Sequence, residues 1–153
     1  MKRFLSFFIV FIIIACLAVA EDSFETVWVL CQPDSYVNIR EYPSGRSVEA
    51  GYAECGYSLE TDRVVKDGFI HVFPSNELGE GWISTGYISY EQPNPVWKEM
   101  TVSAKGRVKA RTTINGKRRV WLKPGTKVMV YWMSDWAVTN KGFIKSEYLT
   151  YEE

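Results

Sequence analysis

The amino-acid sequence predicts an all-β protein, in which two small β-barrels follow one another after an N-terminal apolar signal helix. Short runs rich in β-branched and aromatic residues alternate with turns that contain Gly, Pro or Asn throughout residues 21–153. An order of motifs that begins at Val37 returns at Val108, which indicates one small domain present twice. No stretch after Ala20 keeps the apolar period of a substantial helix.

The first twenty residues are typical of a secretory signal peptide that is cleaved after Ala20. Lys2 and Arg3 precede an uncharged apolar run that is short for a membrane span of about 20 residues. Two alternatives stay open: Cys16 stands where a bacterial lipobox has its lipidated cysteine, and the segment could remain as an uncleaved anchor. All three make the mature chain secreted or extracytoplasmic, with the membrane reached only through this segment or a lipid.

The first repeat predicts a series of short strands. Lys66-Asp67-Gly68 predicts a tight turn, and the polar residues 74–80 predict a longer surface loop. Tyr87-Ile88 closes the unit. The strands are expected at residues 26–30, 36–39, 48–53, 57–61, 69–73 and 81–84.

The second repeat predicts the same plan with a hairpin turn at Asn115-Gly116. Its strands are expected at residues 108–111, 120–122, 127–133, 136–139 and 143–144, before Tyr148-Leu149 closes the unit. The proline-containing segment between the repeats predicts a short, stiff linker. The predicted divisions are the signal peptide at 1–20, an acidic barrel at 21–91, the linker at 92–98 and a basic barrel at 99–153.

Both repeats carry the same motifs in the same order. Val37-Asn38-Ile39-Arg40 leads to Gly81-Trp82-Ile83-Ser84, and Val108-Lys109-Ala110-Arg111 leads to Gly142-Phe143-Ile144-Lys145. This order resembles the bacterial SH3-like (SH3b) domain family over nearly all of the mature chain. The resemblance implies two strongly bent SH3-like β-barrels that bind peptidoglycan or its peptide stems. Lys109 departs from the asparagine usual in the family, so the loop that follows is expected to be set differently.

Charge is distributed unevenly between the repeats. Residues 21–96 carry 13 acidic and 4 basic side chains, and residues 97–153 carry 12 basic and 5 acidic ones, so the halves have formal charges of −9 and +7. Such halves are expected to attract each other across their interface and to present different faces to partners. The alternative is that the charge only keeps both barrels soluble.

No catalytic residue, metal ligand set or cofactor is predicted. His71 is the single histidine, and no His/Cys/Asp/Glu spacing resembles a zinc site. Cys31 and Cys55 are predicted to form a disulfide within the first repeat, or to be free and buried. A nucleophile made of Cys55 with His71 is the less favoured alternative and would make the chain a small hydrolase.

Aromatic side chains are the preferred candidates for ligand contact, because they exceed what two small cores can bury. The basic cluster Lys117-Arg118-Arg119 is expected to meet an anionic partner. The predicted function is non-enzymatic binding, to cell-wall peptidoglycan or alternatively to a secreted protein as an adaptor; the export signal disfavours nucleic acid. The candidate ligand-binding residues are Tyr42, Trp82, Tyr87, Trp132, Trp136 and Tyr148.

Overall fold

A computed structural model of the chain describes residues 23–74 and 79–151, and these are almost entirely β-structure. The predicted signal segment, with Cys16, lies outside these residues, and within them no helix could span a membrane. The first half contains β1 (Glu25–Val29), β2 (Tyr36–Arg40), β3 (Glu49–Glu54), β4 (Ser58–Thr61), β5 (Val65–Lys66), β6 (Phe69–Val72), β7 (Gly81–Ser84), the 3₁₀ turn η1 (Thr85–Tyr87) and β8 (Ile88–Ser89). The second contains β9 (Asn94–Val102), β10 (Val108–Arg111), β11 (Arg118–Leu122), β12 (Lys127–Met133), β13 (Trp136–Thr139), β14 (Gly142–Lys145), the 3₁₀ turn η2 (Ser146–Tyr148) and β15 (Leu149–Thr150).

The strands form three antiparallel sheets. Their orders are β4-β1-β8 and β3-β2-β7-β6-β5 in the first half, and β11-β10-β14-β13-β12-β9-β15 in the second. The all-β class predicted from the sequence is therefore confirmed. None of these sheets closes on itself within the described residues, and the two sheets of the first half are linked by one bridge, between Glu60 and Phe73. Closed barrels were expected, and the described strands form open, strongly bent sheets instead.

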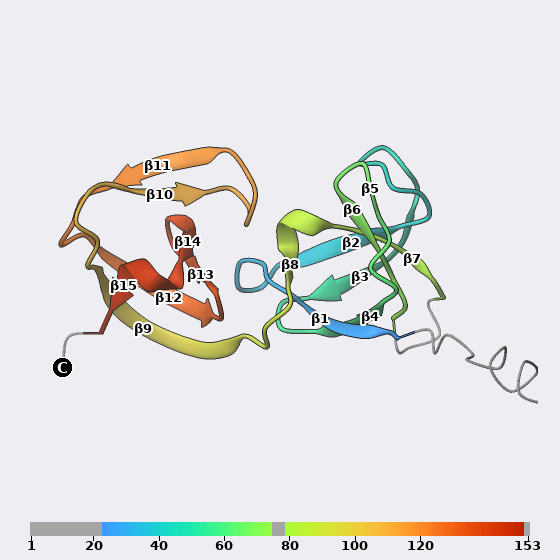
Figure 1. Cartoon of the computed structure of the whole chain (residues 1–153), viewed down its shortest axis with the longest axis horizontal. Coiled ribbons are helices and arrows are strands. Elements are labelled where there is room, and N and C mark those ends of the chain that lie inside the picture. Colours follow the sequence, from blue (N-terminus) through green and yellow to red (C-terminus); the bar gives the residue numbers. More distant parts are fainter. Residues whose placement is uncertain (1–22, 75–78, 152–153) are drawn as a thin grey trace, which may run out of the picture.

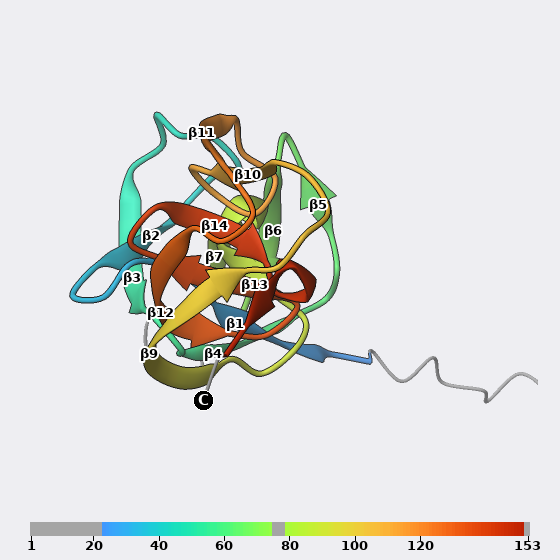
Figure 2. The ribbon, with the colours of Figure 1, turned by 90° about the vertical axis from the view of Figure 1, so that its left-hand side faces the viewer.

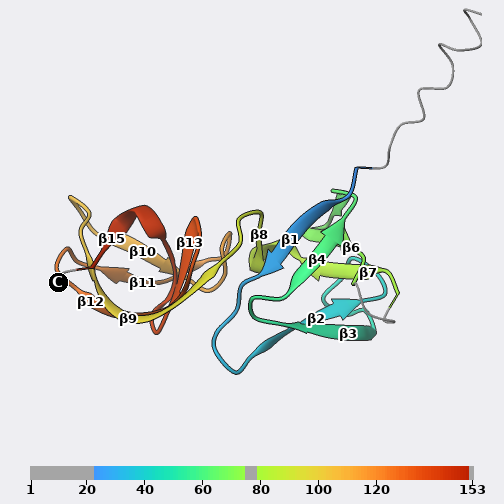
Figure 3. The same ribbon diagram turned by 90° about the horizontal axis from the view of Figure 1, so that it is seen from below.

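The two halves lie side by side along the long axis of the molecule, as Figures 1 and 3 show. Figure 2 looks along this axis, with the second half in front of the first. The order of corresponding strands agrees between the halves, because β2 lies between β3 and β7 as β10 lies between β11 and β14. A tight Asp67-Gly68 turn joins β5 to β6 as predicted, with φ of 52° and 79° at its two residues.

An arginine at the end of β2 and of β10 fixes the loop that follows. Arg40 Nη1 donates a hydrogen bond to the carbonyl oxygen of Ser47 at 2.7 Å, and Arg111 Nη1 donates one to that of Gly116 at 2.9 Å. Both arginine side chains are half-buried. Each guanidinium group therefore donates to a carbonyl oxygen of the loop in place of water, and that carbonyl gains a partner. This bond explains why both motifs end in arginine.

The glycines that open β7 and β14 allow a close approach to the same arginines. A Cβ at Gly142, whose φ is 119°, would collide with the carbonyl oxygen of Arg111. A Cβ at Gly81 would collide with the Ile39 side chain and lie 3.2 Å from the carbonyl oxygen of Arg40. Glycine is thus required where β14 crosses β10, and the two motifs are parts of one packing arrangement.

Buried apolar residues form one core in each half. The first core is built from residues that alternate along β1, β2, β6 and β7, and the second from those of β9, β10, β12 and β14. A third cluster lies where the halves meet. It contains Leu30 of the first half, which is fully buried, with Ile114, Trp136, Val138 and Phe143 of the second.

The junction between the halves combines the buried apolar cluster with several polar contacts, among them a hydrogen bond from Ser89 Oγ to Asp135 Oδ1 at 3.3 Å. Besides the buried cluster, Ile114 N donates to Gly86 O at 2.9 Å, and Gln32 Nε2 donates to Thr139 O at 3.2 Å. The ion pairs seen among the described residues join groups of the same half: Arg40–Glu49, Arg63–Glu25, His71–Asp62, His71–Glu80 and Lys127–Glu99. The described ion pairs therefore do not join the halves, apolar burial and hydrogen bonds do, and the expected electrostatic attraction stays a prediction.

Two segments differ from the local prediction. Residues 94–98, assigned to a linker, form the start of β9, because residues 94 and 95 pair with Met133 and Trp132. Residues 112–117 form a longer loop in place of a two-residue turn at Asn115-Gly116, since Ile114 is drawn into the junction. In both cases the decisive partner is distant in sequence.

Candidate functional site

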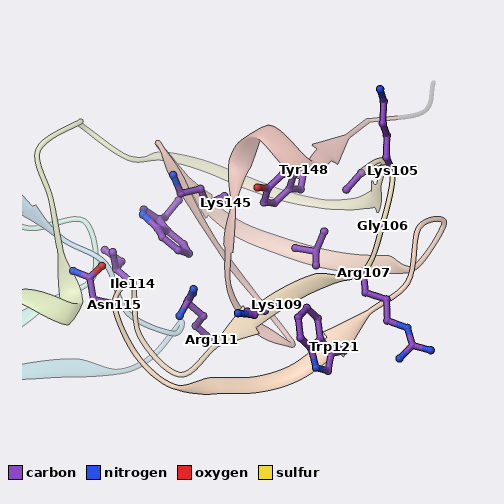
Figure 4. Close-up of a pocket in the computed structure, with 13 residues that line it drawn as sticks. Lys105, Gly106, Arg107, Lys109, Arg111, Ile114, Asn115, Trp121, Lys145 and Tyr148 are labelled. Atoms are coloured by element: carbon purple, nitrogen blue, oxygen red, sulfur yellow. The ribbon is translucent and has the colours of Figure 1, made fainter.

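The second half contains an open pocket of about 710 Å³ beside β10. It lies between the segment that precedes β10, the loop after it, the end of β14 and the turn η2 (Figure 4). No carboxylate lines it, so its field is positive. Its side chains include five cations, Lys105, Arg107, Lys109, Arg111 and Lys145, and three aromatic residues, Trp121, Trp136 and Tyr148.

Strand alternation and turn positions bring these side chains together. In β10, Val108 and Ala110 are buried, so Lys109 and Arg111 lie on the opposite face. In β14 the first three residues are buried and Lys145, at the end of the strand, is exposed. Tyr148 follows at the end of η2. The pocket thus receives residues that are separated by more than forty positions but lie at adjacent strand ends.

Aromatic rings hold the ammonium groups in the pocket. Lys109 Nζ lies 5.3 Å from the ring centre of Trp121, and Lys145 Nζ lies 5.8 Å from that of Trp136. Each contact is a cation–π interaction that restricts a flexible side chain without neutralising its charge. Beside them, a hydrogen bond to the Glu147 carboxylate, together with its charge, raises the pKa of Tyr148, so the phenol of Tyr148 is already engaged by a partner of its own half.

The corresponding positions of the first half line a smaller hollow of about 450 Å³. Asn38 stands in place of Lys109, and Ser84 in place of Lys145, so two cations are missing. Thr112 and Phe143 of the second half also line this hollow, and Tyr87 lies 6.2 Å from Phe143, ring centre to ring centre. The hollow of the first half is therefore walled in part by the second half. The equivalent pocket of the second half is lined only by its own residues.

The six aromatic residues predicted to bind ligand fall into separate places. Trp136 and Tyr148 line the cationic pocket, whereas Tyr87 lines the hollow at the junction. Trp82 packs against His71, with ring centres 4.9 Å apart. Tyr42 is exposed in the loop after β2, and Trp132 lines a cleft described below. These six residues, predicted together as ligand contacts, therefore do not gather at one site.

The cations of the pocket and Trp121 were missed as site residues. The signal that could have found them is the alternation of Val108 to Arg111, which places two basic side chains on one face next to the basic segment 105–107. The predicted patch Lys117, Arg118 and Arg119 is exposed where β11 begins. The guanidinium of Arg118 lies 5.3 Å from the ring centre of Trp121, so this patch continues the rim of the pocket.

Cys31 and Cys55 lie against each other as free thiols in this structure. Cys55 Sγ accepts a hydrogen bond from Cys31 N at 3.1 Å and donates one to Cys31 O at 2.9 Å. The hydrogen bond between the thiols, together with burial, raises the pKa of Cys31, and the same bond lowers the pKa of Cys55. Their adjacency is what a disulfide would require, and the bridge itself stays a prediction.

His71 belongs to a different network. Its Nδ1 lies 2.8 Å from Asp62 Oδ2, and its ring packs between Phe73 and Trp82. The hydrogen bonds of Cys55 go to Cys31, so the alternative couple of Cys55 with His71 is not assembled. No group of three His, Cys, Asp or Glu side chains that could hold a metal occurs in the described part of the chain.

Replacing Asp62 by Asn is expected to lower stability at pH 7 and to lower it less at pH 2.5. Partial burial alone would raise the pKa of Asp62, but hydrogen bonds from His71 and the Val64 amide lower it overall. Because the folded-state pKa lies below the unfolded one, the carboxylate stabilises the fold above about pH 4, and this contribution is lost as pH falls through the folded value. The loss at pH 7 should be below about 1 kcal/mol for so exposed a pair.

Urea unfolding of the two proteins at both pH values measures this difference. Asp67→Asn is the matched control, because Asp67 is exposed and Asn suits its positive φ of 52°. An Asp62→Asn deficit that is equal at pH 7 and pH 2.5 would show that the carboxylate charge is not the cause.

The fold and pocket define an all-β protein with an open, cationic, aromatic-lined pocket. No protein-family model matches the chain, and no curated protein matches it. Two solved structures from Trichomonas vaginalis are similar over 87% of this chain: NlpC1, at 10% identity and a TM-score of 0.37, and NlpC2, at 12% and 0.39. The match covers 48% of NlpC1 and 50% of NlpC2, so the chain spans about half the length of each.

Proposed function

We propose that this chain is an exported, non-enzymatic protein of the bacterial cell envelope, built from two SH3-like units, and that it binds peptidoglycan through its peptide stems. The observation that carries the proposal is the pocket of the second half, which gathers five cations and three aromatic rings without a carboxylate. Peptide stems carry free carboxylates, which such a pocket would attract. The signal-like first twenty residues favour export, with retention through a lipid or an uncleaved anchor as the alternatives.

Three features support two copies of one domain. The corresponding strands have the same order in their sheets, and an arginine braces the loop after β2 and after β10. A glycine permits the close approach of the next strand to that arginine in both halves. These features correspond to the motifs that resemble the SH3-like family.

Binding in the pocket would combine two kinds of contact. Lys109 and Lys145 lie exposed at its edge and can each donate charge-assisted hydrogen bonds to a carboxylate. Trp121 and Trp136 offer faces against which a sugar ring or an apolar side chain can pack. Arg111 already bonds to Gly116, so its role is to hold the loop that borders the pocket.

The test is sedimentation with purified cell wall at low and moderate salt. The double variant Lys109→Glu/Lys145→Glu should bind at least tenfold more weakly, which corresponds to about 1.4 kcal/mol or more of binding free energy. Lys123→Glu/Lys141→Glu is the control, because it makes the same change in net charge on exposed residues that do not line the pocket. Failure of the unchanged protein to sediment, or equal losses in both variants, would remove the proposal.

A second candidate function is adaptor binding to another secreted protein. The observation that favours it is that the described ion pairs lie within each half. The acidic side chains of the first half and the basic side chains of the second are therefore not paired with each other and can meet a partner. Absence of wall binding, together with capture of a secreted protein that the pocket variant loses, would favour this alternative.

A further inference from the structure

A second hollow of opposite charge lies at the junction of the halves. It has a volume of about 350 Å³ and is formed by the turn between β1 and β2, the end of β3, and the strands β9 and β12. Asp34 and Glu54 line it with Tyr36, Trp97 and Trp132, and no lysine or arginine does. A shallower hollow continues from Tyr36 along β3, where Tyr52 and another carboxylate, Glu49, line it. We call the two together the acidic cleft.

Three of the four aromatic side chains of the acidic cleft are exposed, and each of the three packs against another aromatic ring. Tyr36 is 64% exposed and Tyr52 is 60% exposed, and their ring centres lie 5.4 Å apart. Trp97 is 57% exposed and meets Tyr131 edge to face at 5.1 Å. A monomeric protein rarely exposes several large aromatic side chains side by side unless they form a binding surface.

The backbone at Trp97 departs from the regular strand in a way that aims this side chain. Lys98 pairs with Val130 and Pro95 with Trp132, so Val96 and Trp97 together oppose Tyr131 alone. This is a β-bulge, and Trp97 has the positive φ of 50° that glycine usually takes in such a bulge. Bulges re-aim side chains, and this one carries the bulkiest residue in a conformation that disfavours it.

The chemistry of the acidic cleft selects a cation. The faces of indole and phenol rings attract ammonium and guanidinium groups, and the carboxylates of Asp34 and Glu54 add a direct charge. Neither carboxylate has an ion-pair partner among the described residues. The same features repel anions, so this site and the cationic pocket take different groups.

We propose that the acidic cleft is a second binding site, which takes a peptide segment bearing a lysine or arginine side chain next to an apolar residue. The deeper hollow accepts the cation between Asp34, Glu54 and the tryptophans. The continuation past Tyr36 and Tyr52 accepts the neighbouring apolar residue and the extended backbone. Asp34 and Tyr36 belong to the first half and Trp97 and Trp132 to the second, so the site exists only while the halves are docked.

The test uses the full chain and the capped peptide Gly-Lys-Leu-Lys-Gly, with Gly-Glu-Leu-Glu-Gly as the reference probe, by calorimetry. The lysine peptide should bind and the glutamate peptide should not. Asp34→Asn/Glu54→Gln should weaken binding at least tenfold, whereas Glu41→Gln/Glu60→Gln, which removes the same charge from exposed residues outside the cleft, should weaken it less than twofold. Trp97→Gly should also weaken binding at least tenfold while the chain stays folded, because glycine suits φ of 50°.

Three outcomes would overturn the proposal. The first is no binding of the lysine peptide at millimolar concentration, and the second is an equal loss in both carboxylate variants, which would show only long-range attraction. The third is concentration-dependent self-association, measured by sedimentation velocity, that Asp34→Asn/Glu54→Gln abolishes, since the occupant would then be a second copy. Lys109→Glu/Lys145→Glu should leave lysine-peptide binding intact, which separates this site from the cationic pocket.

Discussion

The Gly142→Ala variant is expected to lose about 3 kcal/mol of folding free energy through one added methyl group. The added Cβ would collide with the carbonyl oxygen of Arg111, a backbone atom that cannot turn aside, and φ of 119° disfavours any side chain. The strain falls on the pairing of β14 with β10 and so on the bond from Arg111 to Gly116. The walls of the cationic pocket depend on the same pairing.

Chemical unfolding followed by circular dichroism and tryptophan fluorescence measures this loss. Gly106→Ala is the matched control in the same half, because a Cβ there meets nothing within 4 Å. The control should be unchanged or slightly more stable, by less than about 1 kcal/mol. If Gly142→Ala were as stable as the control, the close approach of the two strands would not be the reason for glycine.

Truncating Leu30 to alanine is expected to cost about 3 kcal/mol and to uncouple the halves. Leu30 is fully buried in the cluster at the junction and contributes the apolar contact of the first half with Phe143 and its neighbours. It is not part of the first core, so most of its loss falls on docking. Unfolding should therefore change from one cooperative transition to two.

Scanning calorimetry with limited proteolysis between residues 89 and 94 follows the uncoupling. Val48→Ala serves as the control, since Val48 is 65% exposed and its truncation should change stability by less than about 0.5 kcal/mol. A single transition at an unchanged temperature for Leu30→Ala would mean that the junction adds nothing to the stability of either half. The variant should also weaken lysine-peptide binding, because the acidic cleft needs both halves.

Most strands could be predicted from the sequence because their patterns are local. The β-branched run before Leu30 and the Asp67-Gly68 turn each specify their conformation within a few residues, and they appear as β1 and the β5–β6 hairpin. The start of β9 could not be predicted, because the local sequence around Asn94 and Pro95 is typical of a linker. These residues form a strand only because they pair with β12, which is distant in sequence. The loop after Arg111 likewise takes its form from a contact with the other half.

The candidate site was predictable only in part. Trp136 and Tyr148 were identified as ligand contacts and line the cationic pocket, since each belongs to a motif that ends at the same edge of the sheet. Lys105, Lys109 and Lys145 look like ordinary surface lysines in the sequence. Their convergence depends on how β10 pairs with β14, which spacing along the chain does not express.

The short connection between β8 and β9 has a consequence for selectivity among polymers. Residues 90–93 alone connect the end of β8 to the start of β9, as Figure 3 shows, and the apolar junction packs the halves together beside them. The cationic pocket and the acidic cleft are therefore held at a fixed separation, which cannot adjust to a ligand whose charged groups are spaced differently. A polymer that carries both kinds of charge gains from two-point attachment only if its repeat length matches that separation. The protein would then bind weakly to polymers that carry the right charges at the wrong spacing.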